Sequence, residues 1–168
     1  MPLRNKPSPR TTAQLCALLL VSTLSAATLA QTGNRVEQII IRAQRATLDQ
    51  SAGTGLYQGN AELHQGSRHL RADTIRITLE QGTPVLVEAE GNLVTLEDEG
   101  IVEARGKRLV YDVDIQRIRI FEQAYVNHQG RVFEGAELEY DLQSKQVDAR
   151  GGGEDGRVRL VIPAEEME

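Results

Sequence analysis

The strongest constraint on the fold of this chain is a repeat of about thirty residues whose apolar pattern changes phase in its middle. Four stretches share the order apolar, charged, small, and a further apolar residue follows five positions after each small one. The small residues are Ala43, Ala72, Ala104 and Gly135, and the apolar residues that follow them are Leu48, Ile77, Leu109 and Tyr140. A period of this length indicates stacked structural units of two to three strands each.

Within the units, apolar and polar residues alternate as they do in β-strands. Residues 75–79 and 118–120 have a period of two, and glycine-containing turn sequences such as residues 65–67 and 81–84 separate these runs. Leu70 and Ala72 have one phase, whereas Ile75 and Ile77 have the other. Since a strand cannot change phase without a bulge or bend, we predict an all-β fold in which each unit is a strand, a corner at the small residue and a second strand.

Composition limits what this β-protein can be. The chain of 168 residues is 40% hydrophobic but has only four Tyr, two Phe and no Trp, so its core must be mainly aliphatic. Its net charge of −5 disfavours a nucleic-acid-binding protein, which needs a basic surface. A single cysteine excludes a disulfide framework and a multi-cysteine metal cluster.

The N-terminus is typical of a secretory signal peptide. Arg4, Lys6 and Arg10 precede an apolar run over residues 13–27, and Thr28-Leu29-Ala30 resembles a cleavage site. We therefore expect residues 1–30 to be removed, which leaves residues 31–168 as one domain with a net charge of −8 and no cysteine, ending in a short disordered tail at 164–168. The alternative is a retained membrane anchor, although the apolar run is shorter than the ~20 residues that span a bilayer.

Few residues have the spacing of a catalytic or metal site, so we predict no enzyme, no cofactor and no metal. His64, His69 and His128 do not match a metal-ligand motif, and the first two flank a turn sequence and are predicted to be surface turn residues. Asp49 and Asp141 directly follow the repeated apolar residue, and Asp112 comes shortly after it. They could pair as catalytic carboxylates, but an Asp that starts a turn and binds its own backbone is the simpler interpretation.

Several short motifs, taken in order, resemble the LptA family of periplasmic lipopolysaccharide-transport proteins, which carry an OstA-like domain. The matching stretches are residues 39–49, 57–66, 70–75, 102–104, 133–140 and 157–163. The sequence departs from the family pattern at Glu122-Gln123, where the family has a second Gly-Asn.

The resemblance implies a fold, a cargo and partners. The expected fold is an antiparallel β-jellyroll, a slightly open V-shaped roll with an apolar interior groove. The expected function is to pass lipopolysaccharide from an LptC-like inner-membrane protein toward an LptD-like outer-membrane protein, through head-to-tail copies and without catalysis. Two other interpretations stay open: an LptC-like anchored component of the same fold, and a structural adaptor that binds no lipid. A carbohydrate-acting β-roll enzyme is a weaker third.

The apolar pattern and the resemblance together name the residues that we expect to face lipid and to dock partners. Leu48 is predicted to face inward and its neighbour Thr47 outward. The predicted lipid-binding residues are Ile39, Ile41, Leu48, Tyr57, Leu70, Ile75, Ile77, Leu79, Leu96, Val102, Leu109, Tyr111, Ile118, Ile120, Phe133, Leu138 and Tyr140. The predicted docking edges are Val36, Ile39 and Ile41 at one end and Val158, Leu160 and Ile162 at the other.

Overall fold

The structure is a computed structural model that describes residues 37–99, 101–152 and 156–164, without the side chains of residues 101 and 102. It contains ten strands: β1 (Ile39–Arg42), β2 (Arg45–Asp49), β3 (Thr54–Gln65), β4 (Arg68–Glu80), β5 (Thr83–Asp98), β6 (Ile101–Asp112), β7 (Arg117–His128), β8 (Arg131–Asp141), β9 (Val147–Arg150) and β10 (Arg159–Val161). The expected signal peptide, its cleavage site, Val36 and residues 165–168 lie outside the described residues. None of the described residues forms a helix that could cross a membrane.

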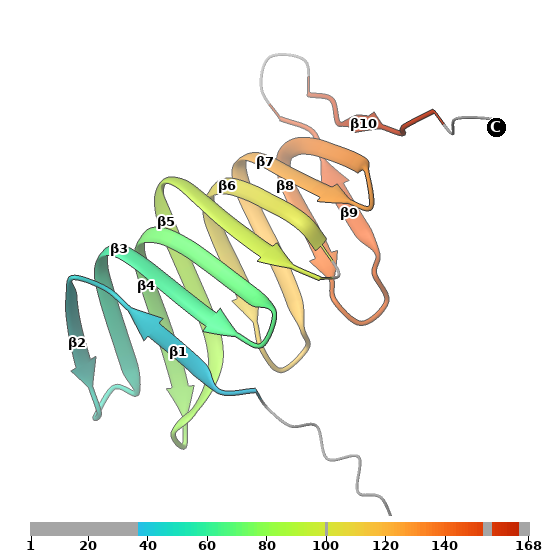
Figure 1. The fold of residues 1–168 in the computed structure, drawn as a ribbon. Helices are drawn as coiled ribbons and strands as arrows, with labels where there is room; N and C mark the ends of the chain where they lie inside the picture. Colours follow the sequence, from blue (N-terminus) through green and yellow to red (C-terminus); the bar gives the residue numbers. More distant parts are fainter. Residues whose placement is uncertain (1–36, 100, 153–155, 165–168) are drawn as a thin grey trace, which may run out of the picture. The chain divides into compact units, whose positions relative to one another are not determined.

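All ten strands belong to one antiparallel sheet (Figure 1). The order is β1-β3-β4-β5-β6-β7-β8-β10, while β2 pairs with β3 and β9 pairs with β8. The six long strands β3 to β8 are therefore neighbours in sequence as well as in space, joined by hairpins. The predicted all-β antiparallel fold is confirmed.

A line of register breaks crosses the sheet and bends every long strand near its middle. The pairing is interrupted between Gln58 and Ala61 in β3, between Arg71 and Thr74 in β4, and between Glu90 and Val94 in β5. It is interrupted again at 105–108 in β6, at 121–124 in β7 and opposite Gly135 in β8. The predicted corners at Ala72 and Gly135 are confirmed, as is that at Ala43, which lies between β1 and β2. The corner predicted at Ala104 is wrong by two residues, because the close approach of the backbone occurs at Gly106 instead.

The corner line divides the sheet into two layers. The first layer contains β1, β10 and the residues of the long strands at 61–65, 68–72, 94–98, 101–106, 124–128 and 131–135. The second layer contains β2, β9 and residues 54–58, 74–80, 83–90, 108–112, 117–121 and 137–141. Each edge of the sheet thus carries two short strands, one for each layer.

The corners depend on unusual backbone conformations. Gly59 and Asn60 bend β3 with φ values of 81° and 45°, and Glu122 and Gln123 bend β7 in the same way with 59° and 61°. A side chain at Gly106 would place its Cβ 2.6 Å from Ile120, so this corner needs a glycine. The pair Glu122-Gln123 therefore makes the same kind of bend as Gly59-Asn60 but adopts the left-handed conformation with two ordinary side chains.

The inner faces of the two layers share one hydrophobic core. Twenty residues in it are at most 7% exposed. The largest fully buried side chains are Tyr140, Ile75, Leu109, Ile118, Ile120 and Leu138. Aliphatic residues dominate this list, which agrees with the scarcity of aromatic residues in the sequence.

Candidate functional site

The inner face of the second layer is a continuous apolar row. Because directly paired residues of an antiparallel sheet point to the same face, the register fixes its members. From β2 to β9 the row contains Leu48, Gly55, Ile77, Val87, Tyr111, Ile118, Tyr140 and Val147. Thr47 belongs to the opposite, outer row with Leu56 and Arg76.

The inner face of the first layer has a matching row. From β1 to β10 it contains Ile41, Leu63, Leu70, Leu96, Ala104, Val126, Phe133 and Leu160. Both rows run from one edge of the sheet to the other, so two facing apolar surfaces span all the strands of each layer.

The predicted lipid-facing residues fall into two groups along these surfaces. Ten of them are buried in the shared core: Leu70, Ile75, Ile77, Leu96, Leu109, Tyr111, Ile118, Ile120, Leu138 and Tyr140. Five are partly buried and pack against the core: Ile39, Ile41, Tyr57, Leu79 and Phe133. The side chain of Val102 is outside the described part of the structure. In the middle of the roll the interior is thus filled by the protein's own side chains.

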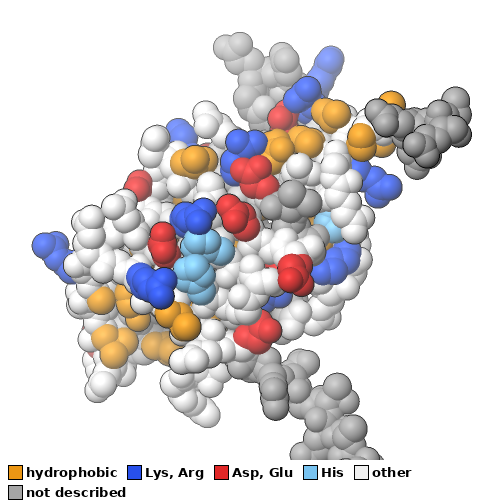
Figure 2. Space-filling model, in the orientation of Figure 1, with side chains coloured by type: hydrophobic (Ala, Val, Ile, Leu, Met, Phe, Trp, Pro, Cys, Tyr) orange, Lys and Arg blue, Asp and Glu red, His pale blue; other side chains and the backbone are white. Residues whose placement is uncertain are grey.

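The two edges of the sheet expose their apolar residues. Leu48, on the inner face of β2, is 57% exposed, and at the other edge Leu160 is 50% and Ile162 64% exposed. Figure 2 shows hydrophobic side chains gathered near β10 and again near the opposite edge. The apolar surface that is closed in the middle of the roll is therefore open to solvent at both ends.

Sequence reasoning missed several members of the inner face. Leu63, Val87, Val94, Val126 and Leu142 are all buried. Val87 and Val126 belong to β5 and β7, which lie between the segments that carry the repeat. For Val87, the alternation of Val87-Glu88-Ala89-Glu90 was a signal that could have identified it.

Polar residues join the two layers at the rim opposite the corner line. Arg68, at the start of β4 in the first layer, donates a hydrogen bond from Nη1 to the Tyr111 hydroxyl of the second layer over 3.1 Å. Its Nε also binds Asp98 Oδ2 at 2.7 Å, and Ser67 donates to the other oxygen of Asp98. Burial raises the pKa of Tyr111, and its protonated hydroxyl accepts the bond from Arg68.

A second contact across the rim involves His128 and Tyr140. Tyr140 Oη lies 3.2 Å from His128 Nδ1, and burial raises the pKa of Tyr140 as well. His128 ends β7 in the first layer, whereas Tyr140 is near the end of β8 in the second. We call Arg68, Asp98, Tyr111, His128 and Tyr140 the rim contacts, because they hold the two layers together where the roll would open.

The repeated aspartates serve turns. Asp49 Oδ1 accepts a hydrogen bond from the Ala52 amide at 2.9 Å, and Asp141 Oδ1 accepts one from Ser144 at 2.8 Å. Asp112 Oδ1 makes the equivalent contact with the Ile115 amide at 3.3 Å. The Ser51 hydroxyl, followed by the Ala52 amide, holds the pKa of Asp49 below its usual value, and the Ser144 amide does the same for Asp141. The turn interpretation of this trio is confirmed.

The prediction that His64 and His69 are surface turn residues is wrong. The hairpin between β3 and β4 has only Gly66 and Ser67 in its turn, so both histidines belong to the strands and face each other as a cross-strand pair. They lie on the outer face with Glu62, surrounded by charged side chains (Figure 2). Partial burial is the main cause that lowers the pKa of His69. Electrostatic repulsion from the neighbouring His64 lowers it further.

Comparison with known proteins agrees with this geometry. Residues 40–146, which include the corner line and most of both apolar rows, match the family model described as LptA/(LptD N-terminal domain) LPS transport protein. The chain belongs to this family. The LptA-family crystal structure of LptH from Pseudomonas aeruginosa has a TM-score of 0.71 and 27% sequence identity, covering 76% of this chain and 96% of that one. It is described as the LptA-homologous periplasmic component of the lipopolysaccharide transport device.

Two relatives of the LptA family support the assignment along most of the chain. The lipopolysaccharide export system protein LptH of Pseudomonas aeruginosa is 29% identical over 131 residues, covering 74% of this chain and 75% of that protein. The lipopolysaccharide export system protein LptA of Haemophilus influenzae is 24% identical over 156 residues, covering 89% and 90%. The family resemblance seen in the sequence motifs is thereby confirmed.

Proposed function

We propose that this member of the LptA family is a periplasmic carrier that holds lipopolysaccharide acyl chains between its two layers as the lipid moves from the inner to the outer membrane. The observation that supports this most directly is the pair of apolar rows that run from edge to edge and are exposed at both ends. Burying acyl carbons gains ~0.8 kcal/mol per methylene, whereas separating the packed layers and ordering the chain cost free energy. The net affinity is then modest, as a carrier requires.

The two sheet edges are the proposed docking sites. An LptC-like inner-membrane protein would add strands beside β1 and β2, around Ile39 and Ile41. A second copy or the LptD-like outer-membrane protein would add strands beside β9 and β10, around Val158, Leu160 and Ile162. All three of these C-terminal residues are exposed. Backbone groups on an unpaired edge can bind a further strand by β-augmentation.

The proposed carrier catalyses no reaction. The aspartates that could have formed a carboxylate pair are instead engaged with backbone amides of their own turns. Loss of activity toward periplasmic glycans in an Asp112→Asn variant would be needed to revive an enzymatic role.

The decisive experiment is photo-crosslinking to lipopolysaccharide at matched positions on the two faces of each edge. Leu48 and Thr47 are adjacent and exposed on β2, but Leu48 shares the inner row with Gly55 and Thr47 the outer row with Leu56. Leu160 and Val161 form the same kind of pair on β10, opposite Phe133 and Val132. Because both residues of each pair are exposed, a difference in labelling within a pair reports the face on which the lipid binds.

We expect lipid adducts with the photoreactive residue at Leu48 and Leu160 but not at Thr47 and Val161. Equal labelling of both faces would indicate non-specific binding to the surface and would contradict an interior path. Absence of adducts at all four positions would favour an adaptor whose core is permanently filled. Sizing the exported protein by mass spectrometry separately tests the anchored, LptC-like alternative.

A further inference from the structure

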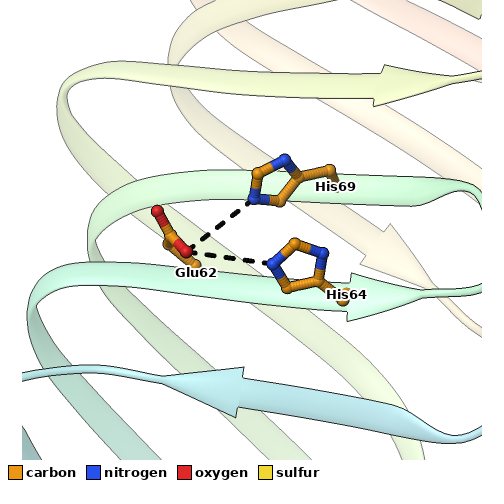
Figure 3. A group of neighbouring side chains, drawn as sticks. All are labelled: Glu62, His64 and His69. Atoms are coloured by element: carbon orange, nitrogen blue, oxygen red, sulfur yellow. Dashed lines mark ion pairs between the residues drawn. The ribbon is translucent and has the colours of Figure 1, made fainter.

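Three side chains on the outer face converge as metal ligands would. Glu62 and His64 are two residues apart on β3 and so point to the same face, and His69 on β4 is the cross-strand partner of His64. Figure 3 shows both imidazole rings directing one nitrogen toward the carboxylate of Glu62. From this arrangement we propose that Glu62, His64 and His69 form a binding site for a divalent transition-metal ion such as Zn²⁺.

The distances suit coordination better than hydrogen bonding. Nε2 of His64 and of His69 lie 3.8 Å and 4.0 Å from the same oxygen, Oε2 of Glu62. These separations are too long for a hydrogen bond. Ligand atoms about 2.1 Å from a tetrahedral Zn²⁺ are roughly 3.4 Å apart. The two nitrogens and the oxygen would meet on one ion once the stacked rings turn so that their in-plane lone pairs converge.

The two ring nitrogens have no other partner among the described residues. Both Nε2 atoms are shielded from solvent and lack a hydrogen bond. A shielded imidazole nitrogen without a partner loses its hydration and gains nothing in return, which is a cost that a bound cation would offset. The rings are stacked with centroids 3.9 Å apart, and one ligand atom from each of the three side chains lies within 4.8 Å of the other two.

Neighbouring residues orient the carboxylate and balance its charge. Arg71 Nε lies 3.9 Å from Glu62 Oε1, which leaves Oε2 for the two imidazoles. Arg71 also pairs with Glu97 at 3.4 Å, and Glu97 is the cross-strand neighbour of His69 on β5. Arg42 on β1 is the cross-strand partner of Glu62, so two carboxylates and two guanidinium groups balance around the neutral histidines. Two His and one carboxylate, with water completing the shell, form a common Zn²⁺ ligand set.

This inference is independent of the proposed lipid path. The site lies on the outer face, whereas the acyl chains would contact the inner one. A bound ion would crosslink β3 to β4 one strand away from the β1 edge, where Ile40 pairs with His64. The consequence would be a stiffer first layer at that edge.

The test is calorimetric titration of Zn²⁺ into the purified, metal-free protein without a histidine tag. We expect one ion per chain and weakening by about tenfold or more in each of the variants Glu62→Gln, His64→Gln and His69→Gln. The matched control is Glu103→Gln, because Glu103 is another outer-face carboxylate paired with an arginine, Arg105 at 3.2 Å. No binding, or binding that survives the double change His64→Gln/His69→Gln, would overturn the proposal.

A second measurement does not depend on the folding of any variant. X-ray absorption of the Zn²⁺-loaded wild-type protein should show two imidazole ligands at about 2.0–2.1 Å and one or more oxygens. A shell of oxygen alone would contradict the assignment. Lipopolysaccharide crosslinking at Leu48 should proceed with or without the ion, so failure of one proposal is distinguishable from failure of the other.

Discussion

At the scale of single residues, the Tyr111 hydroxyl is the clearest link between the layers. Tyr111→Phe should lower the free energy of unfolding by about 1–2 kcal/mol, because Arg68 loses a hydrogen-bond acceptor in a partly buried position. Urea denaturation measures this loss. Tyr125→Phe is the control, since Tyr125 contacts Arg105 through its ring, 3.9 Å from the guanidinium carbon. An equal loss in both variants would mean that the rim bond contributes nothing specific.

The two residues at the β7 corner hold a conformation that favours glycine. Replacing Glu122, with φ of 59°, by glycine should raise the free energy of unfolding by about 0.5–1 kcal/mol, because the left-handed strain disappears. The converse change at the equivalent corner, Gly59→Ala, should destabilise the protein, since Gly59 has φ of 81° and its Cβ would lie 2.5 Å from Gln44. Thermal unfolding of the two variants should therefore shift in opposite directions.

The turn residues Asp49 and Asp141 should make the stability of the protein depend on pH. The pKa values of Asp49 and Asp141 are lowered from 3.8, chiefly by the Ser51 hydroxyl for Asp49 and by the Ser144 amide for Asp141. A lowered folded-state pKa contributes stability that is present above 3.8 and is lost as the pH falls below it. The double variant Asp49→Asn/Asp141→Asn should therefore lose less stability on acidification than the wild type.

Urea unfolding of the wild type and of the double variant is measured at neutral pH and at a pH well below 3.8. Asp114→Asn, at an exposed loop position, is the control and should follow the wild type. An identical acid response of the double variant and the wild type would show that these turns do not couple to protonation.

At the scale of elements, β10 is the strand that an added partner would meet. It has three exposed residues and pairs only with β8 among the described strands. Leu160→Pro should weaken head-to-tail association, because proline removes a backbone donor, while circular dichroism should show an intact fold. Leu160→Ala keeps that donor and is the matched control. Sedimentation that is unchanged in the proline variant would remove β10 from the proposed interface.

The elements also show which parts of the fold the sequence determines locally. Alternation predicted the strands, and the small residues Ala43, Ala72 and Gly135 marked three corners correctly. The repeat did not mark the corners in β3, β5 and β7, because its anchors lie on the other strands. In β7 the corner residues Glu122-Gln123 also contain no glycine. The repeat pattern therefore identifies a corner only where one of its small residues occupies the bend.

The candidate sites were less accessible to sequence reasoning, because they depend on pairing between distant residues. Arg68 and Tyr111 are 43 positions apart and meet only when two layers close on each other. The histidines are close in sequence, but their pairing depends on a turn of two residues instead of three. A shift of one residue in the pairing of that hairpin would have stopped the two histidines from lying opposite each other.

At the scale of the whole roll, the rim contacts predict which part of the structure separates when lipid binds. If acyl chains enter between the layers, the rim must separate while the strands stay continuous through the corner line. Hydrogen exchange at the hairpins around 65–68 and 128–131 should therefore quicken when lipopolysaccharide is added, and exchange at the corner residues should not. Uniform slowing at both places would instead indicate binding to a closed roll and would argue against opening at the rim.

Each layer contains eight strands, an even number, in strict antiparallel alternation. The outermost strands of a layer therefore run in opposite directions: β1 against β10, and β2 against β9. When one copy follows another without being turned over, the last strand of the first meets the first strand of the next in antiparallel sense, in both layers at once. With seven or nine strands the junction would be parallel. Even strand count thus makes the chain a unit that can be repeated indefinitely along one axis.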